Sequence, residues 1–322
     1  MKPLIWIIDE EWSDYELESA ILKERYPGCV IRRSTYDYMT DLEDFGRRAD
    51  GILSQIYTTI DGEVIRQLEK CRAIAVYGGG YDRIDIASAK AKGIKVTNVS
   101  NYCKEDLADY TLAAIYGFYK KLAPLAVKVK TLPWGAQAID KPPVRLNRCT
   151  LHIIGLGRIG REVARLALNN GLAVTAFDPY VSAEEMANLK VKKVDWGEGL
   201  KDADYLSVNC ILNSETTNLL TYNDFKIMKP SAYLINTARG PIIKEDDLIR
   251  ALDEGLLAGA MLDVITVEPP TYREKIFSCA GAAVTPHVSY ISLQSFDELK
   301  RRAANNLIMG MEGEVSPDLV NP

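Results

Sequence analysis

The stretch LHIIGLGRIG, residues 151–160, decides the fold of this 322-residue chain. An apolar run, Leu151–Ile154, leads directly into three glycines, Gly155, Gly157 and Gly160. Glycine at these positions allows backbone N–H groups to approach a pyrophosphate, and the third glycine lets the next helix lie close to the sheet. The pattern is therefore typical of a dinucleotide-binding turn between a strand and a helix.

The residues that follow the glycines strengthen this interpretation. Residues 158–169 predict a helix whose N-terminal dipole favours phosphate binding, with Gly171 at its C-terminal end. The next predicted strand ends at Asp178, roughly 20 residues after the last glycine, where a carboxylate bonds the ribose hydroxyls of NAD and repels the 2′-phosphate of NADP. No Arg or Lys follows Asp178 directly. The sequence favours NAD, the alternative being an ordinary strand–turn–helix with a helix-capping aspartate.

Short apolar runs alternate with amphipathic stretches along the whole chain, which predicts parallel strands joined by right-handed helical crossovers. The predicted strands before the glycine turn are 4–8, 29–31, 51–53, 73–77 and 94–99. Those from the turn onward are 151–154, 174–177, 205–208, 233–236, 261–264 and 283–285. A long helix is expected at 105–122, irregular chain at 124–143, and a last helix at 293–309. We therefore predict an α/β protein with two doubly wound parallel-sheet domains.

Composition narrows the classes of function. Hydrophobic residues make up 47% and charged residues 26%, and the formal net charge of -5 offers no basic stripe for a nucleic-acid partner. No apolar run approaches the roughly 18 residues of a membrane span, and we expect no signal peptide because the first apolar run is short. The cysteines form no CxxC pair, so we expect reduced thiols, no metal site and a cytoplasmic location. They are Cys29, Cys71, Cys103, Cys149, Cys210 and Cys279.

Three ionisable residues follow predicted strands in the second half of the chain, where ligands of an open α/β sheet bind. Arg239 offers a fork of donors for the carboxylate and carbonyl of a 2-keto acid. His287 is suited to proton transfer at neutral pH, and Glu268 would orient its imidazole. A capping arginine, a loop glutamate and a turn histidine are the alternatives for each residue taken singly. The other histidine, His152, lies within a predicted strand and is interpreted as a core residue.

Over essentially its whole length the chain resembles the D-isomer-specific 2-hydroxyacid dehydrogenases. The matching segments are residues 80–85, 151–178, 236–240, 262–264, 268–269 and 285–287. Within that family the runs Cys103–Thr111 and Asn209–Cys210 most resemble the branch that contains the C-terminal-binding-protein corepressors and their bacterial relatives. The resemblance implies hydride transfer between NAD(H) and a small 2-hydroxy acid or 2-keto acid.

The resemblance also implies an organisation and a set of site residues. A flavodoxin-like substrate domain would comprise residues 1–101 and 290–322, and a Rossmann NAD-binding domain residues 102–289, with a cleft between them. Members are usually homodimers joined through the NAD-binding domain. Arg239, Glu268 and His287 would be catalytic. Cofactor positions would be Gly155, Gly157, Arg158, Ile159, Gly160, Asp178, Cys210, Thr216, Thr237 and Asp263, and substrate positions Gly78, Gly79, Gly80, Arg239 and Tyr290.

Several positions depart from the family pattern. The segment Ser54–Thr58 carries no arginine, which argues against a phosphorylated substrate. Tyr290 stands where the corepressor branch has tryptophan, so Tyr57, Tyr77 and Tyr290 are candidates for a pocket that takes an apolar or aromatic side chain, with core packing as the alternative. Two other functions remain open: an NAD(H)-sensing scaffold that binds proteins with little catalysis, and formate oxidation, whose branch carries glutamine in place of Glu268.

Overall fold

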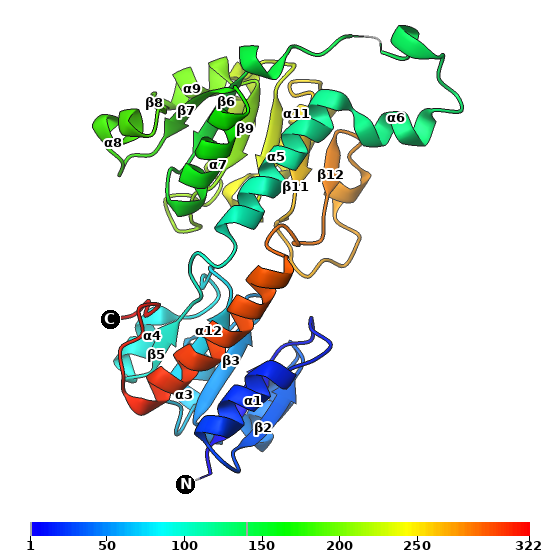
Figure 1. Cartoon of the computed structure of the whole chain (residues 1–322). Coiled ribbons are helices and arrows are strands. Elements are labelled where there is room, and N and C mark those ends of the chain that lie inside the picture. Colours follow the sequence, from blue (N-terminus) through cyan, green and yellow to red (C-terminus); the bar gives the residue numbers. More distant parts are fainter. Residues whose placement is uncertain (1, 140) are drawn as a thin grey trace. The chain divides into compact units, whose positions relative to one another are not determined.

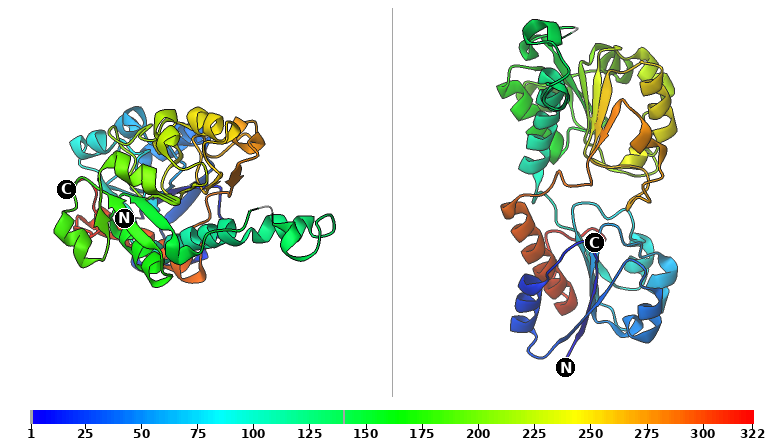
Figure 2. Two further views of the ribbon diagram at one scale, coloured as in Figure 1. Left: turned by 90° about the horizontal axis from the view of Figure 1, so that it is seen from above. Right: turned by 90° about the vertical axis from the view of Figure 1, so that its right-hand side faces the viewer.

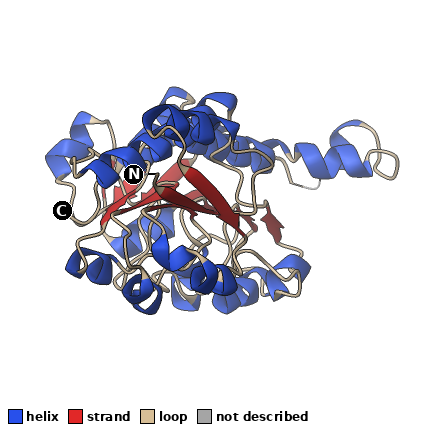
Figure 3. Cartoon of the chain, turned by 90° about the horizontal axis from the view of Figure 1, so that it is seen from below, coloured by secondary structure: helices blue, strands red, loops and turns tan. Residues whose placement is uncertain are grey.

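The computed structural model describes residues 2–139 and 141–322 and divides the chain into two compact units. One unit comprises Met1–Tyr102 and Ser292–Pro322, and the other comprises Cys103–Ile291 (Figure 1). Helices lie on both sides of the strands (Figure 3), as expected for doubly wound folds. The predicted fold class is confirmed.

The first unit contains a five-stranded sheet in the order β2-β1-β3-β4-β5, with parallel pairing throughout. Its strands are β1 (Leu4–Ile8), β2 (Val30–Ser34), β3 (Gly51–Gln55), β4 (Ala73–Tyr77) and β5 (Lys95–Thr97). Its α-helices are α1 (Glu16–Arg25), α2 (Met39–Asp44), α3 (Gly62–Gln67), α4 (Ile86–Ala91) and α12 (Leu293–Glu312). This strand order is the flavodoxin-like one.

The last helix returns from the end of the chain to complete the first unit. Helix α12 lies beside α1 and against β4 (Figures 1 and 2). Glycines allow the close approach: a Cβ at Gly310 would lie 2.6 Å from the side chain of Ala73, and one at Gly51 would lie 2.6 Å from Met311 Sδ. The fully buried runs of β3 and β4 form the centre of this sheet.

The second unit contains a seven-stranded sheet in the order β12-β11-β10-β9-β6-β7-β8. Its strands are β6 (Thr150–Ile154), β7 (Ala173–Phe177), β8 (Lys192–Lys193), β9 (Tyr205–Val208), β10 (Tyr233–Asn236), β11 (Gly259–Leu262) and β12 (Ala282–Val284). Its α-helices are α5 (Lys104–Lys120), α6 (Leu122–Lys128), α7 (Arg158–Asn169), α8 (Ala183–Asn188), α9 (Trp196–Asp202), α10 (Tyr222–Ile227) and α11 (Glu245–Asp253). Counted from β6, the order is that of a Rossmann sheet.

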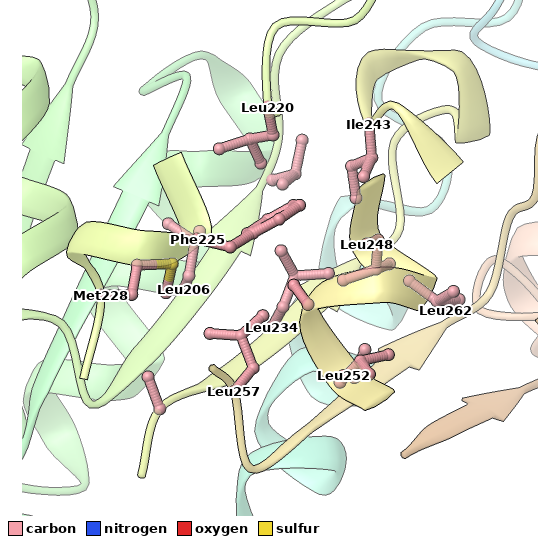
Figure 4. Packing of buried hydrophobic residues seen from close by; sticks show 14 of the residues in the cluster. Leu206, Leu220, Phe225, Met228, Leu234, Ile243, Leu248, Leu252, Leu257 and Leu262 are labelled. Atoms are coloured by element: carbon pink, nitrogen blue, oxygen red, sulfur yellow. The ribbon is translucent and has the colours of Figure 1, made fainter. Parts of the chain in front are cut away.

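Two apolar clusters stabilise the second sheet. One joins α7 and α5 to β6, through residues such as Val163, Ala167 and Ile115. The other packs Phe225 and Leu248, from α10 and α11, against Leu206 and Leu234 of the sheet (Figure 4). Burial of these side chains contributes about 1.5–3 kcal/mol each, which fixes the ends of the strands that carry the candidate site.

Helix α6 is the main departure from the expected secondary structure. The segment after Pro124 was expected to be irregular because of its prolines and glycines, yet Leu122–Lys128 is helical. Pro124 lies in the first turn, where a missing N–H breaks no intrahelical hydrogen bond. No residue of α6 is buried, and the helix extends beyond the sheet of its own unit (Figure 1).

Candidate active site

The three glycines of the 151–160 stretch differ in their surroundings, and each difference fits one requirement of a dinucleotide turn. Gly155 has φ +89°, and a Cβ there would lie 2.7 Å from the backbone N of Cys210. A Cβ at Gly160 would lie 2.1 Å from Gly155 O, so only glycine lets α7 approach the turn. A Cβ at Gly157 would meet nothing within 4 Å. The space for a pyrophosphate therefore adjoins Gly157.

The glycine turn lies where the strand order reverses, between β6 and β9. Helix α7 begins at Arg158, so its free N–H groups and dipole face the same space. Both Gly157 and Arg158 are exposed, and Ile159 is half-buried. These residues fit the binding of NAD, whose diphosphate would be held by the backbone of the turn.

Asp178 follows β7 and is bonded to the glycine turn itself. Its Oδ2 accepts a hydrogen bond from the backbone N of Leu156 at 2.8 Å, and its Oδ1 accepts one from the backbone N of Tyr180 at 2.9 Å. The carboxylate is thereby held at the end of the strand, where ribose hydroxyls are expected.

The other predicted cofactor positions lie at the ends of neighbouring strands. Cys210 follows β9, and burial raises the pKa of its thiol to about 11, so it is protonated at neutral pH. Thr216 Oγ1 donates to the backbone O of Ile211 at 2.6 Å and holds the loop after β9. Thr237 is buried directly after β10. Asp263 follows β11, where its carboxylate accepts hydrogen bonds from the 285–289 turn.

The three predicted catalytic residues follow three adjacent strands. Arg239 comes after β10, Glu268 after β11 and His287 after β12, and these strands pair in parallel as neighbours. Gly240 brings the first two segments together, since a Cβ there would lie 2.0 Å from Ile265 C and O. The carboxyl edge of the sheet thus gathers a guanidinium, a carboxylate and an imidazole in one unit.

Glu268 and His287 form a nearly buried pair. His287 Nδ1 lies 3.1 Å from Glu268 Oε2, and the two side chains are 11% and 12% exposed. Glu268 Oε1 accepts from the backbone N of Ile265 at 2.9 Å, which fixes the carboxylate. Because a carboxylate oxygen accepts hydrogen bonds, this contact fits the imidazole form in which Nδ1 carries a hydrogen and donates it to Glu268.

A residue without a predicted role, Asn236, shapes the turn that carries Arg239. Its Nδ2 donates to Arg239 O at 3.0 Å, and its Oδ1 accepts from the backbone N of Ala238 at 3.0 Å. Asn236 is fully buried. The amide, which can donate and accept at once, closes this turn; its place at the end of a strand before the Arg-Gly pair was the only sequence signal for it.

The predicted substrate positions divide between the units. In the first unit, Gly78 has φ +148° and a Cβ there would lie 2.5 Å from the Ile56 side chain, whereas Gly79 is exposed and Gly80 is half-buried. In the second unit, the ring of Tyr290 lies 6.2 Å from that of His287 in an edge-on arrangement.

The two remaining tyrosine candidates differ in burial. Tyr77 is a core residue, because it is 1% exposed and its hydroxyl donates to Glu18 Oε1 at 3.2 Å. Tyr57 is half-buried and its ring lies 5.8 Å from that of Tyr36. Of these two, only Tyr57 remains a candidate for the substrate pocket.

His152 is a core residue, as interpreted from the sequence. The side chain is fully buried, and Nδ1 is 2.9 Å from Thr175 Oγ1. Burial lowers its pKa to about 4, so the ring is neutral. A Cβ at Gly199 would lie 2.2 Å from His152 Cε1; this glycine of α9 is what makes room for imidazole in the strand.

Over residues 2–139 and 141–322, no group of three or more His, Cys, Asp or Glu side chains is arranged to hold a metal ion. In the same described part of the chain, every helix is too short or too polar to cross a membrane.

Comparison with known proteins identifies the family. Residues 112–289 match the model of the D-isomer specific 2-hydroxyacid dehydrogenase NAD-binding domain. A glyoxylate reductase of Thermococcus litoralis is 31% identical over 85% of this chain and 84% of its own length. A putative 2-hydroxyacid dehydrogenase of Staphylococcus haemolyticus is 30% identical over 85% of this chain and 86% of its own.

A solved structure extends the match to both units. The D-lactate dehydrogenase of Aquifex aeolicus, complexed with NAD and lactic acid, has 25% sequence identity and a TM-score of 0.89, and 99% of each chain is covered. The comparisons do not specify a corepressor-like branch, which stays a prediction. The chain belongs to the D-isomer specific 2-hydroxyacid dehydrogenases and is an NAD-dependent oxidoreductase of 2-hydroxy acids.

Proposed function

We propose that Arg239, Glu268 and His287 carry out the reversible reduction of a small 2-keto acid. The observation that carries this assignment is the His287–Glu268 pair at the carboxyl edge of the sheet, next to β10, the strand that Arg239 follows. An imidazole oriented by a buried carboxylate is a suitable proton donor, and a guanidinium binds a carboxylate through two parallel hydrogen bonds.

In the proposed reaction, Arg239 anchors the substrate carboxylate and polarises the keto carbonyl. Bound NADH supplies a hydride, with its electron pair, to the keto carbon. His287 transfers the proton on Nε2 to the carbonyl oxygen, so the N–H bond breaks, the C=O bond becomes a C–O single bond, and the new C–H and O–H bonds complete the hydroxy acid. Glu268 keeps its hydrogen bond to Nδ1 throughout and stabilises the charged imidazole before the transfer. The reverse direction uses the same groups.

We infer that the substrate is unphosphorylated and small. Two observations support this inference: the loop after β3 carries no arginine, and relatives named glyoxylate reductase cover most of the chain. The backbone of Gly78, Gly79 and Gly80 is proposed to bind the substrate carboxylate, and Tyr290 to line its side-chain pocket. Asp263 is proposed to meet the nicotinamide amide.

We further propose a cytoplasmic homodimer joined through the NAD-binding unit. The segment that includes α6 supports this: Leu122, Val127, Val129 and Trp134 are exposed by 64%, 83%, 51% and 91%. These residues lie within the segment 122–134, here called the exposed arm. Large apolar side chains grouped in this way are typical of protein–protein contacts.

The test is a spectrophotometric assay of NADH oxidation with glyoxylate, pyruvate, hydroxypyruvate, phenylpyruvate and branched 2-keto acids, with NADPH run in parallel. We expect turnover with at least one small acid and a preference for NADH. Failure with every acid, combined with NADH-dependent capture of a peptide partner, would instead favour the protein-binding scaffold. The intact catalytic trio argues against that alternative.

A further inference from the structure

The backbone around His287 adopts a conformation that needs support. His287 has φ +54°, in the left-handed region that a side chain with a Cβ disfavours. Its N–H donates to the backbone O of Thr285 at 2.9 Å, which closes a tight turn after β12. The direction in which this turn presents the imidazole therefore depends on the groups bonded to residues 285–289.

Asp263 holds this turn on both sides of His287. Its Oδ1 accepts from Thr285 Oγ1 at 2.7 Å and from the backbone N of Val288 at 2.9 Å. Its Oδ2 accepts from the backbone N of Ser289 at 2.8 Å. Asp263 is 1% exposed, and hydrogen bonds to a charged group in a dry environment are the strong ones.

Tyr110 extends these contacts to a distant helix. Its hydroxyl lies 2.5 Å from Thr285 Oγ1. Thr285 has a single hydroxyl hydrogen, which it donates to the Asp263 carboxylate, so Tyr110 is the donor to Thr285. Burial raises the pKa of Tyr110 to about 12, and the nearby Asp263 charge acts in the same direction, so the phenol keeps this hydrogen at neutral pH.

The position of Tyr110 is fixed by the core of the second unit. It lies on α5, whose neighbouring residues Ala108 and Leu112 belong to the same buried cluster as Val163 of α7. Helix α5 packs against α7, the helix that begins at the glycine turn. The hydrogen bonds from Tyr110 thus run from the helical layer that supports the cofactor turn to the turn that presents the proton donor.

We propose that Tyr110, through Thr285 and Asp263, is a positioning residue that sets the orientation of His287. This proposal rests on the proposed function, in which His287 transfers the proton. Glu268 fixes the imidazole ring through Nδ1, and the Tyr110–Thr285–Asp263 chain fixes the backbone that carries the ring. Tyr110 and Thr285 are not among the residues proposed to bind NADH, so loss of the hydrogen bond between them should affect the chemical step more than NADH binding.

The first test is Tyr110→Phe, which removes one hydroxyl and keeps the ring. We expect kcat to fall about five- to tenfold, as the loss of one oriented hydrogen bond implies, while KM for the keto acid and Kd for NADH change less than twofold. The matched control is Tyr116→Phe on the same helix, whose hydroxyl bonds to Asn170 at 2.7 Å, away from the turn. A loss in the control equal to that in Tyr110→Phe would contradict the proposal.

Substitutions of Thr285 test the middle member of the hydrogen-bonded series Tyr110–Thr285–Asp263. Thr285→Val should lose kcat as Tyr110→Phe does or more, whereas Thr285→Ser, which keeps the hydroxyl, should retain most of it. The double variant Tyr110→Phe/Thr285→Val should be no slower than Thr285→Val alone, because both changes break the same series of hydrogen bonds. Equal losses in the serine and valine variants, or losses that add fully, would overturn the assignment.

A spectroscopic readout separates this proposal from the proposed function. The chain contains two histidines, His152 and His287, so histidine-labelled protein gives two sets of imidazole NMR signals, assigned with His287→Asn. Tyr110→Phe should shift or broaden the His287 signals and leave those of His152 in place, and Tyr116→Phe should alter neither. Unchanged His287 signals in Tyr110→Phe would refute the positioning role even in a protein that turns over no keto acid.

Discussion

His287 Nδ1 lies 3.1 Å from Glu268 Oε2, and this contact joins two residues that follow neighbouring strands, β11 and β12. The other carboxylate oxygen is bonded to the backbone N of Ile265, so Glu268 is fixed before substrate arrives. A preset hydrogen bond of this kind costs no reorganisation during the reaction.

Glu268→Gln tests the charge of this pair at nearly constant shape. The amide oxygen can still accept from His287 Nδ1, but the stabilisation of a charged imidazole is lost. We expect kcat to fall about 10- to 100-fold, with Kd for NADH within twofold, measured by steady-state kinetics and fluorescence titration. Glu184→Gln, an exposed residue of the same unit, is the control. Equal activity of the two variants would show that Glu268 has no role in the reaction.

Two glycine substitutions separate cofactor binding from folding. Gly157→Ala places a Cβ in open space, so we expect an unfolding free energy within about 0.5 kcal/mol of the parent and at least a tenfold weaker Kd for NADH. Gly160→Ala forces a Cβ onto Gly155 O and should cost about 1–3 kcal/mol of stability. Urea unfolding and NADH titration of both variants measure these effects. Unimpaired NADH binding by Gly157→Ala would show that the pyrophosphate does not bind at Gly157.

Asp178→Asn tests cofactor choice. The change removes the negative charge that repels a 2′-phosphate and keeps one acceptor for the Leu156 N–H. The ratio of kcat/KM for NADPH to that for NADH should rise at least tenfold. Asp195→Asn, an exposed aspartate of the same unit, controls for net charge. A ratio that stays at the parent value in Asp178→Asn would show that other residues select the cofactor.

The buried His152 should make the free energy of unfolding decrease at acidic pH. Burial lowers its pKa from 6.5 to about 4, so between these values the unfolded chain binds a proton that the folded chain does not. Stability is therefore lost as the pH falls through this window, by about 2 kcal/mol between pH 7 and pH 5. His152→Asn should lose less stability over the same interval in urea titrations; an identical pH dependence would mean that His152 does not contribute.

The exposed arm predicts the oligomeric state. Replacing Val127 and Trp134 together by glutamate places charges on two of its most exposed apolar positions, which should disrupt a dimer that uses this arm. Sedimentation should show a dimer for the parent and a monomer for the variant, with unchanged circular dichroism. A dimeric variant would place the interface on another surface.

Much of the second unit could be predicted because local signals and fold rules agree there. The bounds of α7, β9 and β10 follow from strong periodicity, and the glycine pattern places the switch point of the sheet. The carboxyl-edge rule then gathers Arg239, Glu268 and His287 although they are distant in sequence. These inferences depend on spacing and residue type, which a single sequence shows.

What could not be predicted depends on contacts between distant segments. The strand before Asp263 ends at Leu262, earlier than expected, so Asp263 faces the His287 turn instead of continuing the strand. Tyr110 lies in a helix whose apolar spacing indicates packing and gives no sign of a bond to Thr285. Gly199 of α9 makes room for the side chain of His152, which lies in strand β6. Such pairings become visible only once the elements are packed.

The most direct test of the central claim is the pre-steady-state reduction of glyoxylate or pyruvate by NADH in His287→Asn. If His287 is the proton donor, the variant binds NADH with the parent's Kd, and its rate of NADH oxidation falls at least 100-fold. A His287→Asn protein that binds NADH and oxidises it at close to the parent rate would contradict the account.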